Sequence, residues 1–268
     1  MSSGLSDCCV SGHIHSGRPT GLTSRIANLD AYFATPPNGS KAKTLLFLTD
    51  IFGWTLPNAR LLADELAKTG GFYVVVPDFF QGDHVAHDML NTIVPRDPDN
   101  LSIVQKATNT ASMGATLGPW MVRHREAVVR PLVDAVVREL RQDTEVESIG
   151  AIGFCWGGRY AMLLAADGSV EAIVANHPSM VSLPAEAEAI KKPVQINIGD
   201  KDAMVDEAGI KTFQEVLAKK TDVPSEVNVF PGAVHGFTVR GDTESPEERE
   251  RKEKATQNAI AWFQKYLQ

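Results

Sequence analysis

Short apolar runs alternate with longer helical patterns along this chain, and this alternation limits the possible folds more than any other feature. The apolar runs are rich in Val, Ile, Leu and Phe, which is typical of buried strands. They cover residues 43–49, 72–76, 148–154, 170–175, 194–198 and 226–230, and helical patterns cover residues 57–68, 156–166, 206–219 and 247–267. Strands and helices in this order form a mostly parallel central sheet with helices on both faces. The sequence therefore predicts a single α/β domain over residues 1–268.

Two segments stand outside this alternation. Residues 1–22 are mostly small and polar, and we expect them to form an N-terminal arm. Residues 79–119 have no clean period and contain several Pro and Gly residues. A stretch of this length inside a compact domain is usually a lid, an insertion or short helices over a site, and residues 79–119 are predicted to be a lid-like insert.

A strong helical pattern follows the insert, over residues 120–141. Pro131 lies inside this pattern and predicts either a kink or a join between two helices. Apolar residues at helical spacing indicate the face that packs on the sheet. The predicted buried stripe consists of Val128, Leu132, Val136 and Leu140.

Composition excludes several classes of function. The 268 residues carry a net charge of −7 and contain no Lys/Arg-rich run, so nucleic-acid binding is not expected. The apolar runs are too short to span a bilayer, and the first residues lack the apolar core of a signal peptide. Three cysteines make no disulfide framework, which favours a reducing compartment. We therefore expect a cytoplasmic protein with no membrane partner; no pattern indicates its oligomeric state.

The most informative local pattern surrounds Cys155. Gly153 and Gly157 flank this cysteine at two residues on either side, between a predicted strand and a predicted helix. This is the arrangement of a nucleophile elbow, in which a sharp turn exposes the nucleophile above the carboxyl edge of the sheet. The helix that follows favours a thiolate or a developing oxyanion at its N-terminus. The pattern indicates Cys155 as a nucleophile, against the alternative of a small buried side chain.

An activated thiol needs a general base, and the base needs a carboxylate to orient it. In this architecture the acid and then the histidine follow the nucleophile, each after a later strand. His235 is the histidine that follows the final predicted strand, in a glycine-flanked turn. Asp200 and Asp202 both follow the preceding strand, and spacing alone does not choose between them.

Other candidate groups are weaker. His177 follows a strand end that could face the pocket, although a structural hydrogen bond is the simpler interpretation. Cys8, Cys9, His13 and His15 have side chains that suit zinc, but they lack a Cys-x-x-Cys pair. No Gly-x-Gly-x-x-Gly follows the first strand, so a dinucleotide is not expected. The sequence predicts no metal and no cofactor.

Taken together, these motifs resemble the dienelactone hydrolase family, including its carboxymethylenebutenolidase-like eukaryotic members. The resemblance extends over nearly the whole chain, and a Cys nucleophile is specific because most relatives of this fold use Ser. The matching segments are residues 153–158 (GFCWGG), 199–202 (GDKD), 233–237 (AVHGF), 49–54 (TDIFGW), 76–82 (VPDFFQG) and the N-terminal DCCVSGHIHSGRPTG. The resemblance implies an α/β-hydrolase fold.

The resemblance also implies roles for individual residues. Cys155 would be the nucleophile, His235 the base and Asp202 the orienting acid. The backbone N–H groups of Ile51 and Trp156 would form the oxyanion hole.

Further residues would surround this centre. Asp50 takes the place of a carboxylate, commonly Glu in bacterial members, that holds the resting thiol. Arg240 is a plausible counterpart of an arginine that binds a substrate carboxylate. For a second positive group, the resemblance leaves Arg123 or Arg125, beside Trp120, as candidates.

The sequence thus predicts a cysteine-dependent hydrolase that cleaves a small-molecule ester or lactone through a thioester intermediate. Two other interpretations stay open. One is a catalytically idle small-molecule-binding protein on the same scaffold, since fold does not determine function. The other is an acyltransferase, in which an alcohol or amine replaces water at the thioester.

Overall fold

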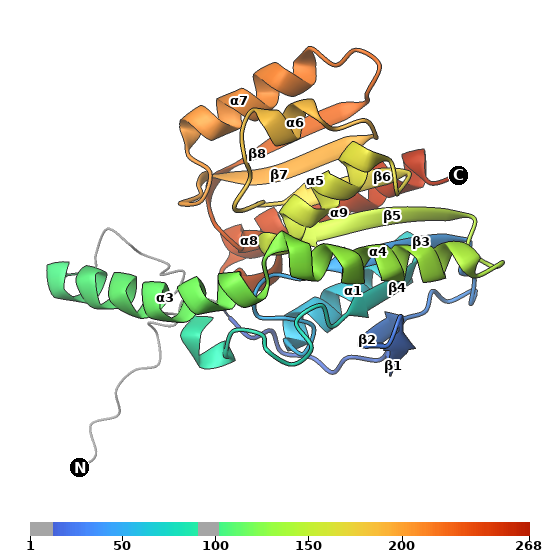
Figure 1. Cartoon of the computed structure of the whole chain (residues 1–268), viewed down its shortest axis with the longest axis horizontal. Helices are drawn as coiled ribbons and strands as arrows, with labels where there is room; N and C mark the ends of the chain where they lie inside the picture. The colour runs from blue at the N-terminus through green and yellow to red at the C-terminus, as the bar shows by residue number, and fades with distance from the viewer. Residues whose placement is uncertain (1–12, 91–101) are drawn as a thin grey trace.

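The computed structural model describes residues 13–90 and 102–268. They form one eight-stranded sheet with the strand order β1-β2-β4-β3-β5-β6-β7-β8 (Figure 1). The strands from β4 to β8 in this order are parallel, whereas β1 and β2 pair antiparallel at one edge. The strands are β1 (Leu22–Ile26), β2 (Leu29–Ala34), β3 (Lys43–Leu48), β4 (Tyr73–Pro77), β5 (Ser148–Phe154), β6 (Ala172–Asn176), β7 (Val194–Lys201) and β8 (Ser225–Val234). The predicted mostly parallel α/β sheet is confirmed.

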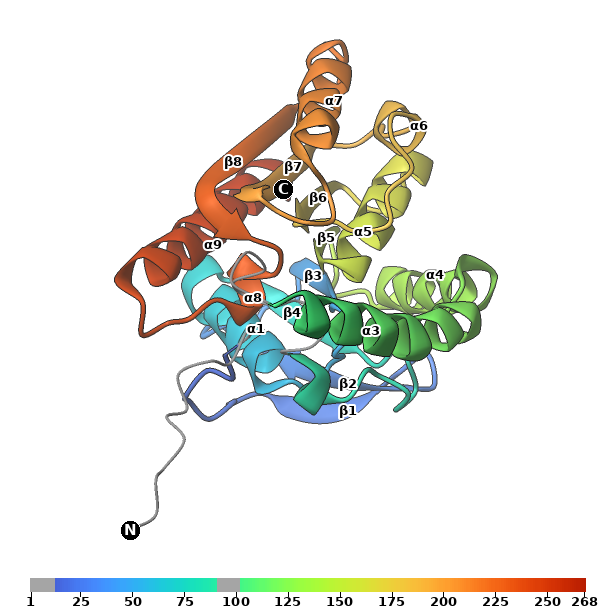
Figure 2. The same cartoon turned by 90° about the vertical axis from the view of Figure 1, so that its left-hand side faces the viewer.

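Helices cover both faces of the sheet. Figure 2 shows α1 and α9 on one face, and α4, α5 and α7 on the other. The helical elements are α1 (Pro57–Gly70), the short 3₁₀ helix η1 (His87–Met89), α3 (Ile103–Arg123), α4 (Glu126–Gln142), α5 (Trp156–Asp167), α6 (Ala185–Glu188), α7 (Glu207–Ala218), α8 (Phe237–Arg240) and α9 (Pro246–Tyr266). No helix in the described ranges is long and apolar enough to cross a membrane.

Strand β3 shows how the sequence fills both layers. Successive side chains of a strand point to opposite faces. Leu45 and Phe47 belong to the core under α1 and α9, whereas Leu46 and Leu48 belong to the core under α4 and α5. All four side chains are fully buried. A run that is apolar throughout is therefore required at this central position.

The last two strands are longer than the sequence predicts. Residues 199–201 and 231–234 were expected in loops, but β7 continues to Lys201 and β8 to Val234. The two strands stay paired across a register shift between Gly199 and Lys201. Pro231 lies inside β8, where it is tolerated because β8 is an edge strand with one unpaired side.

The helical pattern of residues 120–141 forms parts of two helices, but of the kink or join expected at Pro131 the join is wrong. The chain breaks at His124 and Arg125, and Pro131 lies within α4. Trp120 is buried, and its indole N–H donates to the carbonyl of Asp83 at 2.7 Å. This contact fixes the last turn of α3 against the loop after β4, just before the chain leaves the helix at His124.

The predicted buried stripe of α4 is partly wrong. Val136 and Leu140 are buried and Leu132 is partly buried, but Val128 is 38% exposed. Val129, Val133 and Val137 take the remaining buried positions. Residues spaced by four advance about 40° around a helix at each step, so a buried stripe centred on Val136 and Leu140 leaves Val128 towards the solvent.

Helix α3 forms much of the segment expected to be an insert. Figure 1 shows α3 extending sideways beyond the sheet, with its C-terminal end nearest the rest of the molecule. Val104 near its start is 74% exposed. Residues 91–101 of the expected insert lie outside the described residues.

Candidate active site

A strained turn places Cys155 between β5 and α5. Its backbone has φ 54° and ψ −114°, in a region that L-residues rarely adopt. A Cβ on Gly153 would lie 2.1 Å from the carbonyl oxygen of Gly157, and one on Gly157 would lie 2.1 Å from that of Leu48. Glycine is therefore required at both positions. The turn sets the thiol at the N-terminus of α5, above the carboxyl edge of the sheet.

His235 and Asp202 come from the ends of β8 and β7. Nδ1 of His235 lies 2.9 Å from Oδ2 and 3.0 Å from Oδ1 of Asp202, and both side chains are almost fully buried. Asp202 also accepts a hydrogen bond from the amide of Met204 at 2.7 Å, which holds the carboxylate in place. Asp200 instead accepts from the amide of Gly232 at the surface. The geometry thus brings Asp202, and not Asp200, to the imidazole.

The other ring nitrogen of His235 is available for chemistry. Nε2 is buried and has no hydrogen-bond partner in the described part of the chain. Burial disfavours the imidazolium, but the charge of Cys155 and the hydrogen bond that Nδ1–H donates to Asp202 overcome it and raise the pKa of His235 to about 9. Burial likewise disfavours the thiolate, yet the charge of His235 leaves the pKa of Cys155 below its ordinary value. The pair therefore favours a thiolate beside an imidazolium.

A buried ion pair lies next to this centre. Nε of Arg240 is 2.9 Å from Oδ2 of Asp50, and both side chains are at most 4% exposed. Oδ1 of Asp50 accepts from the amide of Phe52 at 3.0 Å. Oδ1 of Asp50 is thus occupied by a backbone amide, whereas Oδ2 lies in the ion pair with Arg240 without a hydrogen bond in the described part of the chain.

The N-terminal arm contributes to the position of Arg240. The amide of His13 donates to the carbonyl of Arg240 at 3.1 Å. The buried side chain of Asn58 on α1 donates to the carbonyls of His13 and Val239 and accepts from the amide of His15. The arm therefore ties the short helix α8, which carries Arg240, to α1.

Two backbone amides flank the thiol at the same edge. Trp156 is the first residue of α5, and Ile51 follows β3 after Asp50. Neither amide donates a hydrogen bond to another described group. The first amides of a helix have no intrahelical acceptor, and they attract negative charge. These two N–H groups can therefore accept an anionic oxygen.

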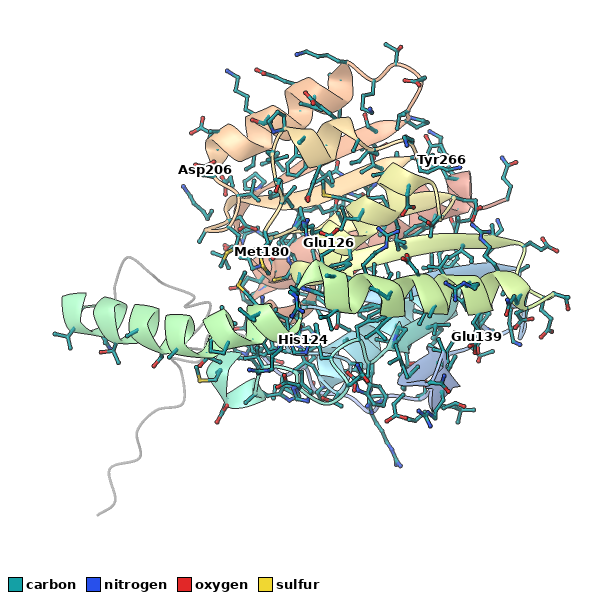
Figure 3. The ribbon with its side chains drawn as sticks, viewed as in Figure 1. His124, Glu126, Glu139, Met180, Asp206 and Tyr266 are labelled. Atoms are coloured by element: carbon teal, nitrogen blue, oxygen red, sulfur yellow. The ribbon has the colours of Figure 1, made fainter. Side chains whose placement is uncertain are left out.

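A cavity of about 210 Å³ opens beside the thiol. Its walls are mostly apolar, and three of its residues come from the C-terminal half of α3. Figure 3 shows Met180 between the α3–α4 junction, marked by His124, and the start of α7, marked by Asp206. The lining residues are Ile51, Leu117, Trp120, Met121, Cys155, Ser179, Met180, Met204, His235 and Arg240. A larger hollow of about 920 Å³ lies between β2 and α1, and none of these residues lines it.

Trp120 and Arg240 thus line the cavity, but three other residues considered for substrate contact do not. Arg123 forms an ion pair with Asp83 at 2.6 Å on the surface. Arg125 is exposed and donates to the carbonyl of Val122. His177 is fully buried behind the cavity, where Nε2 lies 2.7 Å from the hydroxyl of Thr238. Its burial and the charge of His235 hold the pKa of His177 well below the usual range, so it stays neutral.

Ser179 is a site residue that the sequence reasoning missed. Its hydroxyl lies 3.4 Å from the sulfur of Cys155, and its side chain is 2% exposed. Its position directly after β6, at the edge that carries the other site residues, was the available signal. A serine in such a loop has no distinctive motif, so the sequence did not single it out.

The N-terminal histidines have protein partners. His13 lies 3.4 Å from Asp242, and the ring of His15 lies 2.8 Å from the carbonyl of Gly241. Within residues 13–90 and 102–268, no group of three His, Cys, Asp or Glu side chains could hold a metal ion. Cys8 and Cys9 lie outside the described residues.

Comparisons with known proteins bear on the family and the fold. The sequence profile of the Dienelactone hydrolase family matches residues 29–267. The chain is 31% identical over 262 residues to "Hydrolase pyvD" of Aspergillus violaceofuscus, covering 98% of this chain and 97% of that protein. It is 29% identical over 261 residues to the "Carboxymethylenebutenolidase homolog" of Mus musculus, covering 97% of this chain and 96% of that protein. A "Putative Dienelactone Hydrolase" from Klebsiella pneumoniae has the same fold, with a TM-score of 0.67 and 23% identity over 92% of this chain and 99% of that one.

The fold and the site define a hydrolase with the α/β-hydrolase fold, of the type that cleaves esters or lactones. The family match extends over most of the length of the chain. The chain belongs to the dienelactone hydrolase family.

Proposed function

We propose that this protein hydrolyses esters or lactones through a covalent thioester on Cys155. The observation that carries the proposal is the meeting of three groups at one sheet edge. These are a thiol on a strained elbow, an imidazole with a free Nε2, and a carboxylate 2.9 Å from the Nδ1 of that imidazole. Cys155 acts as the nucleophile, His235 as the base and Asp202 as the group that orients it.

The first half of the reaction forms the acyl-enzyme. The substrate carbonyl oxygen binds between the N–H groups of Ile51 and Trp156, and the thiolate of Cys155 attacks the carbonyl carbon. The tetrahedral oxyanion collapses as the C–O bond to the leaving group breaks, and protonated His235 gives its Nε2 proton to the departing oxygen. Loss of one oxyanion donor typically lowers turnover about 10²–10³-fold.

The second half releases the acid. Neutral His235 takes a proton from water, and the resulting hydroxide attacks the thioester carbonyl. The C–S bond breaks, and the thiolate is restored beside an imidazolium. A nucleophilic thiolate must stay unoxidised, so the proposal includes a reducing compartment such as the cytosol.

The cavity supports a small substrate with an apolar acyl portion, because its walls are mostly apolar and its volume is about 210 Å³. Arg240 is the permanently charged residue among its described lining residues, and we propose it as a polar contact for the substrate. Asp50 holds Arg240 through the ion pair at 2.9 Å. A direct role for Asp50 in holding the resting thiol has less support, because Oδ1 accepts from the amide of Phe52 and Oδ2 lies against the guanidinium of Arg240.

A panel of p-nitrophenyl esters, simple lactones and enol lactones tests the proposal. Wild-type protein should hydrolyse members with good leaving groups, and iodoacetamide should abolish this activity while labelling Cys155. The variant Cys155→Ala should fold but lose turnover, whereas Cys155→Ser should keep some, since Ser is the usual nucleophile of this fold. Activity that survives in Cys155→Ala would refute the thioester mechanism.

The same panel separates the alternatives. Substrate binding by calorimetry without turnover in the wild-type protein would indicate an idle binding protein. Formation of a new ester or amide when an alcohol or amine is added would indicate acyl transfer.

A further inference from the structure

The loop after β6 packs directly against the elbow. The amide of Ser179 donates to the carbonyl of Cys155 at 3.1 Å, and the amide of Cys155 donates to the carbonyl of Asn176 at 3.1 Å. Two residues of this loop, His177 and Met180, have positive φ values of 37° and 57°. Such conformations persist where the surrounding structure determines them, and they cluster at functional sites. The loop thus holds Ser179 in a defined position beside the elbow.

The side chain of Ser179 has a single partner within the described residues, the sulfur of Cys155 at 3.4 Å. The hydroxyl is buried, and a buried hydroxyl almost always makes a hydrogen bond. A thiolate has no hydrogen and can only accept. With the sulfur ionised, the hydroxyl must therefore be the donor.

The charged and titratable groups around the sulfur come from three other elements. They are His235 after β8, Arg240 on α8 and Asp50 after β3. Asp50 was expected to hold the thiol, but its oxygens lie against Nε of Arg240 and the amide of Phe52. The neutral side chain in hydrogen-bonding contact with the sulfur is that of Ser179.

We propose that Ser179 is a positioning residue that donates its hydroxyl hydrogen to the thiolate of Cys155. This inference rests on the proposed nucleophilic role of Cys155 and adds a group that acts through it. The hydrogen bond stabilises the ionised sulfur and holds it at one orientation beside the oxyanion amides. When the acyl group transfers to sulfur, the negative charge is lost and the hydrogen bond weakens.

The test is the pH dependence of Cys155 alkylation by iodoacetamide, read by peptide mass spectrometry, together with the thiolate absorbance near 240 nm. The variant Ser179→Ala removes the donor, so the titration of Cys155 should move to higher pH by roughly one unit, about tenfold in the thiol–thiolate equilibrium. Ser179→Thr keeps a hydroxyl at the same position and should leave the titration close to that of the wild type. Ser182→Ala, at an exposed serine three residues further along the loop, is the matched control.

An unchanged titration in Ser179→Ala would overturn the inference. Equal shifts in the Ala and Thr variants would also overturn it, because they would indicate altered packing rather than a lost donor. The result is independent of hydrolysis. If Cys155→Ala kept full activity while Ser179→Ala still moved the titration, the mechanism would fail and the contact would stand.

Discussion

The elbow around Cys155 and the projecting helix α3 both contribute to the cavity, yet their packing is very different. At the elbow, a Cβ added to Gly153 would lie 2.1 Å from a carbonyl oxygen, whereas one added to Gly114 in α3 would meet nothing within 4 Å. Cys155 is 7% exposed, whereas Val104 and Val122 on α3 are 74% and 65% exposed. The reacting groups thus lie in close packing, whereas α3 carries part of the substrate-facing wall on a helix with exposed flanks, where the lining residue Met121 is itself 45% exposed. Substitutions at the reacting groups should therefore change the catalytic rate, whereas substitutions on α3 should change the preference among substrates.

The largest effect on activity is expected among the closely packed groups at the carboxyl edge of the sheet. His235→Gln removes the proton-transferring imidazole, so kcat/KM should fall about 10³–10⁴-fold while the fold is retained. His87→Gln, on η1 in the insert region, is the matched control and should stay within a few-fold of wild type. Ester hydrolysis assays measure both. A fall of less than tenfold in His235→Gln would remove His235 from the mechanism.

A pair of glycine substitutions compares packing directly. Gly153→Ala forces a methyl group against the Gly157 carbonyl and should lower the free energy of unfolding by about 3 kcal/mol or more. Gly114→Ala, in the interior of an exposed helix, should raise it by up to about 1 kcal/mol. Urea unfolding followed by circular dichroism measures the difference. Similar values for the two variants would contradict the contrast between the elbow and α3.

The pH dependence of kcat/KM reports on the Cys155–His235 pair. His235 must be protonated to assist the leaving group, and its pKa is raised to about 9 by Cys155 and Asp202 against burial, so activity should fall as the pH rises above about 9. On the acid side, activity should fall as the thiolate takes up a proton. Asp202→Asn removes a group that raises the pKa of His235, and it should move the alkaline limb to lower pH. An alkaline limb that does not move would show that Asp202 does not act on His235.

The smallest effect is expected on the wall provided by α3. Leu117→Ala enlarges the cavity, and it should change KM for a longer acyl ester by roughly threefold to tenfold with little change for an acetate ester. Val104→Ala, on an exposed part of the same helix, should change neither value. Comparison of p-nitrophenyl acetate and butyrate tests both variants. Equal changes for the two esters in Leu117→Ala would show that this wall does not contribute to acyl-chain selection.

The contrast between the elbow and α3 also explains which parts of the structure the sequence could predict. The strand of residues 148–154 and the elbow after it were predicted with their observed bounds, because apolar runs and paired glycines are local signals. The contacts of Asp50 with Arg240 and of Ser179 with Cys155 were not predicted. They depend on how loops from separate strands meet, which no local pattern records.

In the insert, by contrast, the sequence predicted little of the observed structure. The irregular composition of residues 79–119 indicated an insertion, but not the 21-residue helix α3 or its break at His124. Just before that break Trp120 is buried against Phe80 and Asp83, which are distant in sequence. Tertiary contacts of this kind override the helical pattern of residues 120–141.

The central claim, that Cys155 carries the acyl group during turnover, is tested most directly by trapping the intermediate. Wild-type protein is mixed with a p-nitrophenyl ester, quenched in acid within milliseconds and digested, and the peptide containing Cys155 is examined by mass spectrometry. The account predicts that this peptide gains the mass of the acyl group and that His235→Gln accumulates less of the adduct at the same time. A burst of p-nitrophenol with no acyl group on Cys155, or with the acyl group on another residue, would contradict it.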